Sequence, residues 1–175
     1  MPRHGFIHDK KDIMILILYV AARLPGLIPE DTLMEQVMCD GGFDYFDYSD
    51  ALAQLREEKF IVRDLEGRYS LTKKGADSEK ELGSMLPYSV RMKVEKNLIA
   101  VAKEMERNAL IGADISARGD GLYNVHLSLD DGLGNILSMD MMVPTREASK
   151  RIADNFRKNA EKIYNKLLDL MCEEE

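Results

Sequence analysis

Hydrophobic side chains recur at steps of three and four residues in the first part of the chain. From Asp9 to Leu24 this spacing predicts a helix, which Pro25-Gly26 ends. Nearly every position from Ile13 to Val20 is apolar. We therefore expect this helix to lie at the centre of a hydrophobic core.

Two more helices follow the same periodicity. Pro29 suits a first helical turn, and a second helix runs from there to about Cys39. Asp47 is placed to cap a third helix, which extends from Tyr48 to about Lys59. The inward-facing stripe of that helix consists of Tyr48, Leu52 and Leu55.

A short hairpin and a fourth helix come next. Residues 60–62 and 69–71 predict two strands, and the turn-forming residues 65–68 join them. Thr72 can cap the following helix, which ends near Ser84. The first part of the chain therefore contains three helices, a hairpin and a fourth helix.

In the second part the hydrophobic period changes from that of a helix to that of strands. Apolar and polar positions alternate along three segments, which predicts an antiparallel sheet with one apolar face. The terminal segment again carries apolar residues at steps of three and four. The expected elements are a helix, three strands and a long helix, at residues 89–109, 112–117, 122–129, 135–143 and 144–172.

This order of elements predicts an α+β protein with two domains. Residues 1–86 would form an N-terminal winged helix-turn-helix domain, and residues 87–175 a dimerisation or sensor domain of one helix, a three-stranded antiparallel sheet and a long C-terminal helix. The third helix and its hairpin resemble the winged-helix pattern of bacterial transcription regulators. In that pattern the helix enters the major groove and the hairpin contacts the DNA backbone. Winged helices also dock proteins, so that alternative stays open.

Five stretches carry a wider resemblance. They are Leu16 to Tyr19, Asp50 to Leu55 with Phe60-Ile61, Tyr69 to Gly75, Val125 to Leu129, and Ala160 to Tyr164. Through them the chain, from about Asp12 to Met171, is similar to a bacterial family catalogued as a domain of unknown function and described as winged-helix and regulatory. The resemblance brings no catalytic residue with it. Where such proteins usually have glycine at the end of the recognition helix, this chain has Lys59, which must adopt or avoid a left-handed cap.

The composition is that of a globular protein. The chain has 175 residues, and 45% of them are hydrophobic, which is enough to bury a core. The longest apolar run, residues 13–22, is shorter than the ~20 residues that cross a bilayer, and no cleavage site accompanies it. We therefore expect a cytoplasmic protein without a membrane partner. Cys39 and Cys172 belong to no CxxC motif or Cys/His cluster, which predicts neither a disulfide framework nor a zinc site.

The charge balance argues against a general binder of polyanions. The formal net charge is -7, and residues 1–86, with 11 Lys and Arg against 16 Asp and Glu, carry -5 of it. Phosphate neutralisation dominates non-specific affinity for nucleic acid. Any DNA binding must therefore come from a local basic patch.

Candidate DNA contacts lie on the third helix and around the hairpin. The outward face of the helix presents Ser49, Asp50, Ala53 and Gln54. Gln54 can pair with adenine and Asp50 can accept from cytosine, although each is equally explained as a solvated residue. The cations that could contact phosphates are Arg56, Lys59, Arg63, Arg68, Lys73 and Lys74.

The sequence contains no motif of a known catalytic class. It has no Gly-rich phosphate loop, no nucleophile elbow and no His-carboxylate spacing for a metal. We therefore expect no catalytic residue, no metal site and no cofactor. His126 is the one acid-base candidate, and a structural role suits it better. Met139, Met141 and Met142 could line a pocket for an apolar effector or fill a core.

These observations predict a sequence-specific DNA-binding transcriptional regulator that is not an enzyme and acts as a homodimer on double-stranded DNA. A different interpretation is a non-enzymatic adaptor that uses the winged helix as a docking module. A third interpretation makes the strand module a sensor for an unknown small ligand.

The terminal helix is the expected dimer interface. Its roughly 28 residues span roughly 40 Å, whereas strands of about seven residues span little more than 20 Å. Part of its apolar stripe should therefore meet a second chain. The helix after Pro87 could instead cover the surplus. The interface residues would be Ile152, Phe156, Ile163, Leu167 and Leu170.

Overall fold

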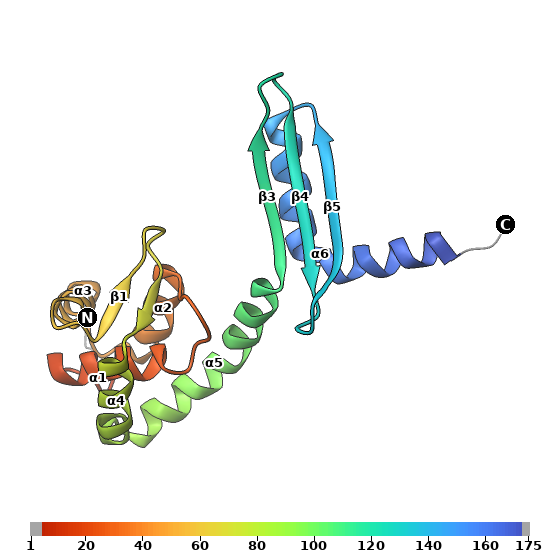
Figure 1. Cartoon of the computed structure of the whole chain (residues 1–175). Coiled ribbons are helices and arrows are strands. Elements are labelled where there is room, and N and C mark those ends of the chain that lie inside the picture. Colours follow the sequence, from red (N-terminus) through yellow and green to blue (C-terminus); the bar gives the residue numbers. More distant parts are fainter. Residues whose placement is uncertain (1–4, 173–175) are drawn as a thin grey trace. The chain divides into compact units, whose positions relative to one another are not determined.

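The protein is an α+β protein, as the sequence predicts. A computed structural model describes residues 5–172, which fold as two compact units, unit 1 up to Met105 and unit 2 from Glu106 onward. Within the described residues there are six α-helices, a two-stranded sheet and a three-stranded antiparallel sheet (Figure 1).

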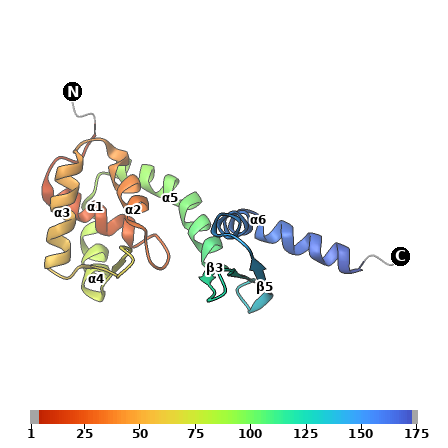
Figure 2. The same cartoon turned by 90° about the horizontal axis from the view of Figure 1, so that it is seen from above.

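Unit 1 contains five helices and a hairpin. Its longer elements are α1 (Lys10–Ala21), α2 (Glu30–Val37), α3 (Tyr45–Glu57), β1 (Ile61–Arg63), β2 (Tyr69–Leu71), α4 (Lys73–Leu82) and α5 (Tyr88–Ala109), the last of which continues into unit 2. Two short 3-10 helices follow α2 and α4, at Met38–Asp40 and Gly83–Met85. Figure 2 shows α2, α3 and α4 around α1.

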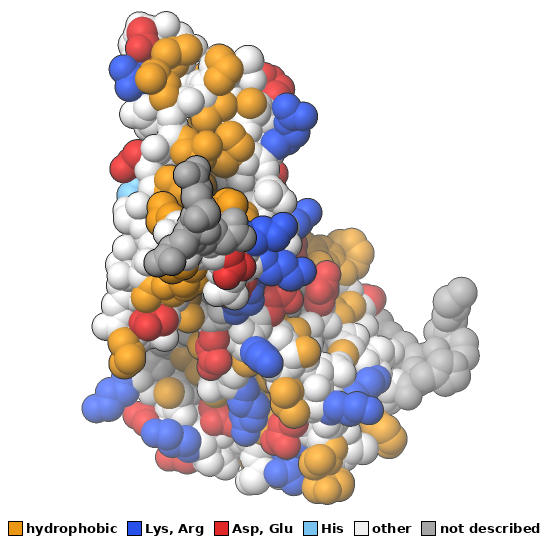
Figure 3. Space-filling view, turned by 90° about the vertical axis from the view of Figure 1, so that its right-hand side faces the viewer, with side chains coloured by type: hydrophobic (Ala, Val, Ile, Leu, Met, Phe, Trp, Pro, Cys, Tyr) orange, Lys and Arg blue, Asp and Glu red, His pale blue; other side chains and the backbone are white. Residues whose placement is uncertain are grey.

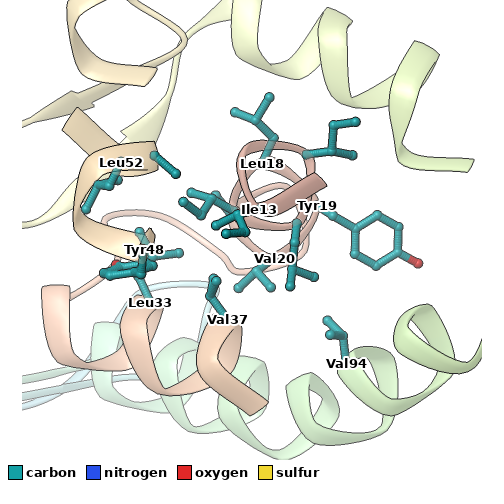
Figure 4. Close-up of a cluster of buried hydrophobic side chains, with 14 of the residues drawn as sticks. Ile13, Leu18, Tyr19, Val20, Leu33, Val37, Tyr48, Leu52 and Val94 are labelled. Carbon is teal, nitrogen blue, oxygen red and sulfur yellow. The ribbon is translucent and has the colours of Figure 1, made fainter. Parts of the chain in front are cut away.

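Helix α1 is the centre of the unit 1 core, as predicted. Every side chain from Ile15 to Ala21 is buried, and so is Ile13. The close-up in Figure 4 shows α1 side chains next to Leu33 of α2 and Tyr48 of α3. The helix ends at Ala21, short of the predicted Leu24. Pro25 prevents the helix from continuing, because it disfavours helical backbone at Leu24 and has no N–H to donate to the Ala21 carbonyl.

Helix α5 is also part of unit 1 for most of its length. Val90, Val94 and Leu98 are buried in the same core as α1. The hydroxyl of Tyr19 donates to Glu95 Oε1 at 2.5 Å, and burial together with this bond raises the pKa of Tyr19 to about 12. Unit 1 therefore extends to Met105, whereas the sequence analysis places its domain boundary after residue 86.

The hairpin forms as predicted, and its second strand, β2, is bonded to β1 and also to Ile28. Ile61 pairs with Leu71 and Arg63 with Tyr69. Tyr69 also exchanges two backbone hydrogen bonds with Ile28, at 2.7 and 2.8 Å. Thr72 caps α4, as predicted, because its Oγ1 accepts from the backbone N–H of Gly75 at 3.1 Å.

Unit 2 is a three-stranded antiparallel sheet with one long helix on one face. The strands β3 (Ile111–Ala117), β4 (Tyr123–Asp130) and β5 (Asn135–Val143) lie in that order, and α6 spans Arg146–Cys172. Side chains from β3, β4, β5 and α6 form a second core. Its buried members are Ile111, Ala113, Val125, Leu127, Leu129, Val143, Ala153, Phe156 and Ala160.

Helix α6 bends at Asn159, which the sequence analysis does not anticipate. Asn159 has φ -130° and ψ 20°, outside the helical region. Its side-chain Nδ2 donates to the backbone carbonyl of Asn155 at 3.2 Å, where a regular helix would use the backbone N–H. Beyond the bend the helix leaves the sheet, and Figures 1 and 2 both show its end extending away from the strands.

Candidate interaction surface on unit 1

Helix α3 begins one turn earlier than predicted. Its cap is Asp44 and not Asp47, because Asp44 Oδ1 accepts from the backbone N–H groups of Phe46 and Asp47 at 2.9 and 3.0 Å. Asp47 Oδ2 accepts in return from the N–H of Asp44 at 3.2 Å. This reciprocal pair is a capping box. It adds Tyr45 and Phe46 to the helix.

The first turn of α3 carries two exposed aromatic side chains that the sequence analysis missed. Phe46 is 77% exposed and Tyr45 is 52% exposed. Their rings meet edge to face with centroids 6.0 Å apart. Large exposed aromatic side chains are unusual unless they meet a partner. The spacing of Asp44 and Asp47 is compatible with a capping box, but either aspartate can cap a helix, so this signal does not by itself place Tyr45 and Phe46 in the helix.

The four predicted recognition residues lie on one outward face of α3. Asp50 and Ala53 are exposed, and Ser49 and Gln54 are half-buried. Gln54 Nε2 donates to Glu58 Oε1 at 2.8 Å, so its amide already has an acceptor within the helix. This face therefore offers carboxylates and small side chains.

Two of the predicted wing cations are paired with carboxylates of unit 1. Arg63 Nη2 lies 2.6 Å from Glu30 Oε2. Arg68 lies 2.8 Å from Asp64 and 3.0 Å from Glu66. Hydrogen bonds from the backbone N–H and side chain of Arg68 hold the pKa of Asp64 below its usual value. The tip of the wing is thus close to neutral.

The remaining cations gather at the end of α3 and the start of α4. Lys59 has φ 59°, so it adopts the left-handed cap that glycine usually provides. Lys74 Nζ donates to the backbone carbonyl of Glu58 at 2.8 Å and lies over the ring of Phe60. Arg56, Lys59 and Lys73 are exposed, and none forms an ion pair with another of residues 5–172. The start of α3 therefore carries carboxylates, whereas its end carries Arg56 and Lys59 together with the exposed carboxylates of Glu57 and Glu58.

The predicted dimer residues on α6 fall into two groups. Phe156 is fully buried in its own unit, and Ile152 and Ile163 pack partly against the same core. Leu167 is half-buried, and Leu170 is 70% exposed. Leu167 and Leu170 are therefore the members of the stripe that lie outside the unit 2 core.

The polar face of the unit 2 sheet holds the acid-base candidate. His126 Nδ1 lies 2.9 Å from Asp140 Oδ1, and Asp114 is its neighbour in register on β3. Among residues 5–172, no group of three or more His, Cys, Asp or Glu side chains is arranged to hold a metal. In the same part of the chain, no helix has the length and hydrophobicity needed to cross a membrane.

Comparison with known protein families gives a match over most of the chain. The model of a protein family described as a domain of unknown function (DUF4364) matches residues 13–171. This confirms the resemblance to a domain of unknown function over most of the chain. No curated protein matches the chain, and no solved structure matches it.

Proposed function

We propose that this chain, which belongs to the family of the domain of unknown function DUF4364, is a non-enzymatic adaptor whose unit 1 is a winged helix that docks a basic protein surface. The order of α1, α2, α3, hairpin and α4 supports the winged-helix assignment. Further support comes from the packing of α3 on α1 and of β2 on Ile28.

The start of α3 is the observation that carries the proposal. In a winged helix this end of the third helix contacts the partner. Here it presents Phe46 and Tyr45 one turn before the exposed carboxylate of Asp50. Exposed aromatic side chains are typical anchors of protein interfaces, and a carboxylate beside them favours a positively charged partner. The same carboxylate, and the net charge of -5 of residues 1–86, would oppose contact with DNA phosphates.

The test is quantitative capture of cross-linked partners from cells that express the tagged protein. Changing Phe46 and Tyr45 together to alanine should lower recovery of the specific partners at least tenfold, because the aromatic anchor is lost. Tyr88→Ala is the matched control, since Tyr88 is 70% exposed on α5 and lies outside the docking surface. If the double variant and the control recovered the same proteins in the same amounts, the docking proposal would be wrong.

A DNA-binding homodimeric regulator is the second candidate, and the cations at the end of α3 favour it. Arg56, Lys59 and Lys73 are exposed near the hairpin, where a wing contacts phosphates. In this function Ser49, Asp50, Ala53 and Gln54 would face the major groove.

The DNA candidate makes a prediction about salt dependence. Changing Arg56, Lys59 and Lys73 together to alanine should weaken binding to every DNA sequence alike. It should also reduce the slope of log K against log salt by about one for each phosphate contact that is lost. Fluorescence anisotropy over a salt series measures both effects. An unchanged slope would count against these cations as phosphate contacts.

A further inference from the structure

The end of α6 beyond Asn159 is an amphipathic helix whose apolar face packs on the unit 2 core at Ala160, Ile163 and Tyr164 and is largely exposed after Leu167. Residues at steps of three and four continue the face that buries Ala160. Leu168 is 42% exposed, Leu170 is 70% exposed and Met171 is 80% exposed. The polar residues lie on the other side, at Lys162, Asn165, Lys166 and Asp169.

A second apolar strip without a full cover runs along β5. Helix α6 packs on β3 and β4 more than on β5. As a result Leu137 and Met139 are only half-buried on the helix-covered face, and Met141 is 37% exposed there. In the space-filling view, hydrophobic side chains form a band in the upper part of the face that lies on the β5 side of the sheet (Figure 3).

The side of α6 next to this strip carries no charge. Arg157 donates to the backbone carbonyl of Ala113, which places that side of the helix over β3. The opposite side, toward β5, presents Ala148, Ile152, Asn155 and Asn159. The strip, defined as Leu137, Met139, Met141 and Ile152, is therefore bounded by uncharged side chains and suits an apolar helix.

We propose that the end of α6 in one copy lies against the β5 strip of a second copy, and the reverse, so that two chains exchange their C-terminal helices. The bend at Asn159 directs the helix away from its own sheet and so leaves both surfaces available. Two complementary apolar surfaces on one chain favour a second copy of that chain over a different protein. This inference does not depend on the function proposed for unit 1.

A two-fold arrangement forms the contact twice. Because specific interfaces begin at ~1,200 Å², a stable dimer requires each of the two contacts to bury about 600 Å². This arrangement differs from a pairing of identical helices, because Phe156 stays in its own core and only the residues beyond the bend change chains.

Cysteine cross-linking tests which surfaces meet. In a background with Cys39→Ser and Cys172→Ser, one preparation carries Met139→Cys and another carries Leu168→Cys. The two preparations are mixed, allowed to exchange subunits and mildly oxidised. If C-terminal helices lie on the β5 strip of the other copy, the mixture should yield a disulfide-linked dimer that neither preparation forms alone. A dimer from the Leu168→Cys preparation alone would show that identical helices pair, and would overturn the proposal.

Sedimentation equilibrium of the full chain gives a second, independent test. Leu170→Glu with Met171→Glu should raise the dimer dissociation constant at least 100-fold while the fold remains intact, because both residues are exposed within one chain. Lys166→Glu is the control, since it makes the same change in net charge on the polar side of the helix. The proposal is refuted if the parent chain is a monomer at high micromolar concentration, or if the double variant remains as dimeric as the parent.

Discussion

Replacing Gly75 with alanine is expected to destabilise unit 1 by about 3 kcal/mol. A Cβ at this position would lie 2.1 Å from the backbone carbonyl oxygen of Phe60, and that oxygen also accepts hydrogen bonds from Thr72. The neighbour is backbone, so it cannot rotate away as a flexible side chain would. The added methyl group would separate α4 from the end of α3 and from β1.

Thermal unfolding followed by circular dichroism should show a fall in Tm of more than about 10 °C for unit 1. Gly26→Ala separates steric overlap from backbone strain, because Gly26 has φ 65° but no heavy atom within 4 Å of the place that an alanine Cβ would take. That control should cost about 1 kcal/mol. If the two variants unfolded at the same temperature, close contact between α4 and Phe60 would not be the reason for glycine at position 75.

Phe156→Ala should be the most damaging single change in unit 2. The ring is 1% exposed and packs in the core between α6 and the sheet. Truncating a buried phenylalanine costs about 3–5 kcal/mol, because it removes buried apolar surface and leaves a cavity. A small unit has little stability in excess of that loss. We therefore expect unit 2 to unfold while unit 1 stays folded.

Amide NMR spectra would measure this effect unit by unit. Resonances of residues 111–143 should collapse toward unfolded positions in the variant, and those of α1 should remain. Leu133→Ala is the matched control, since Leu133 is 97% exposed in the loop between β4 and β5 and its truncation should change stability by less than about 0.5 kcal/mol. Dispersed strand resonances in Phe156→Ala would argue against a core centred on this ring.

The hydrophobic periodicity of the sequence predicts the helices and strands that are specified by their own residues and close neighbours. Helix α1 is almost wholly apolar, and the alternation of β4 places Val125, Leu127 and Leu129 on one buried face. The turn residues after Arg63 and the hydroxyl of Thr72 act within a few residues of their own positions. Such signals need no knowledge of the rest of the fold.

The features that the sequence does not predict depend on a choice between two similar residues or on a contact with another side chain. Both Asp44 and Asp47 can cap a helix, and the sequence alone does not decide between them. Arg63 looks like a phosphate contact until Glu30, 33 residues earlier, is found beside it. Likewise Asn159 suits a regular helix by periodicity, and its bend results from a side-chain bond to Asn155. The pairing of Arg63 with Glu30 is one reason that we propose a protein partner for unit 1.

The residues of helix α5 are divided between the two units, and this affects how its backbone amides exchange with solvent. The helix is continuous, but its residues up to Met105 belong to unit 1, and its last turn is tied to unit 2 by the bonds between Arg107 and Glu161. Backbone amide hydrogens exchange with solvent at rates set by the opening of the unit that holds them. Hydrogen exchange along this one helix would therefore report two separate opening free energies, with the change between them near Met105.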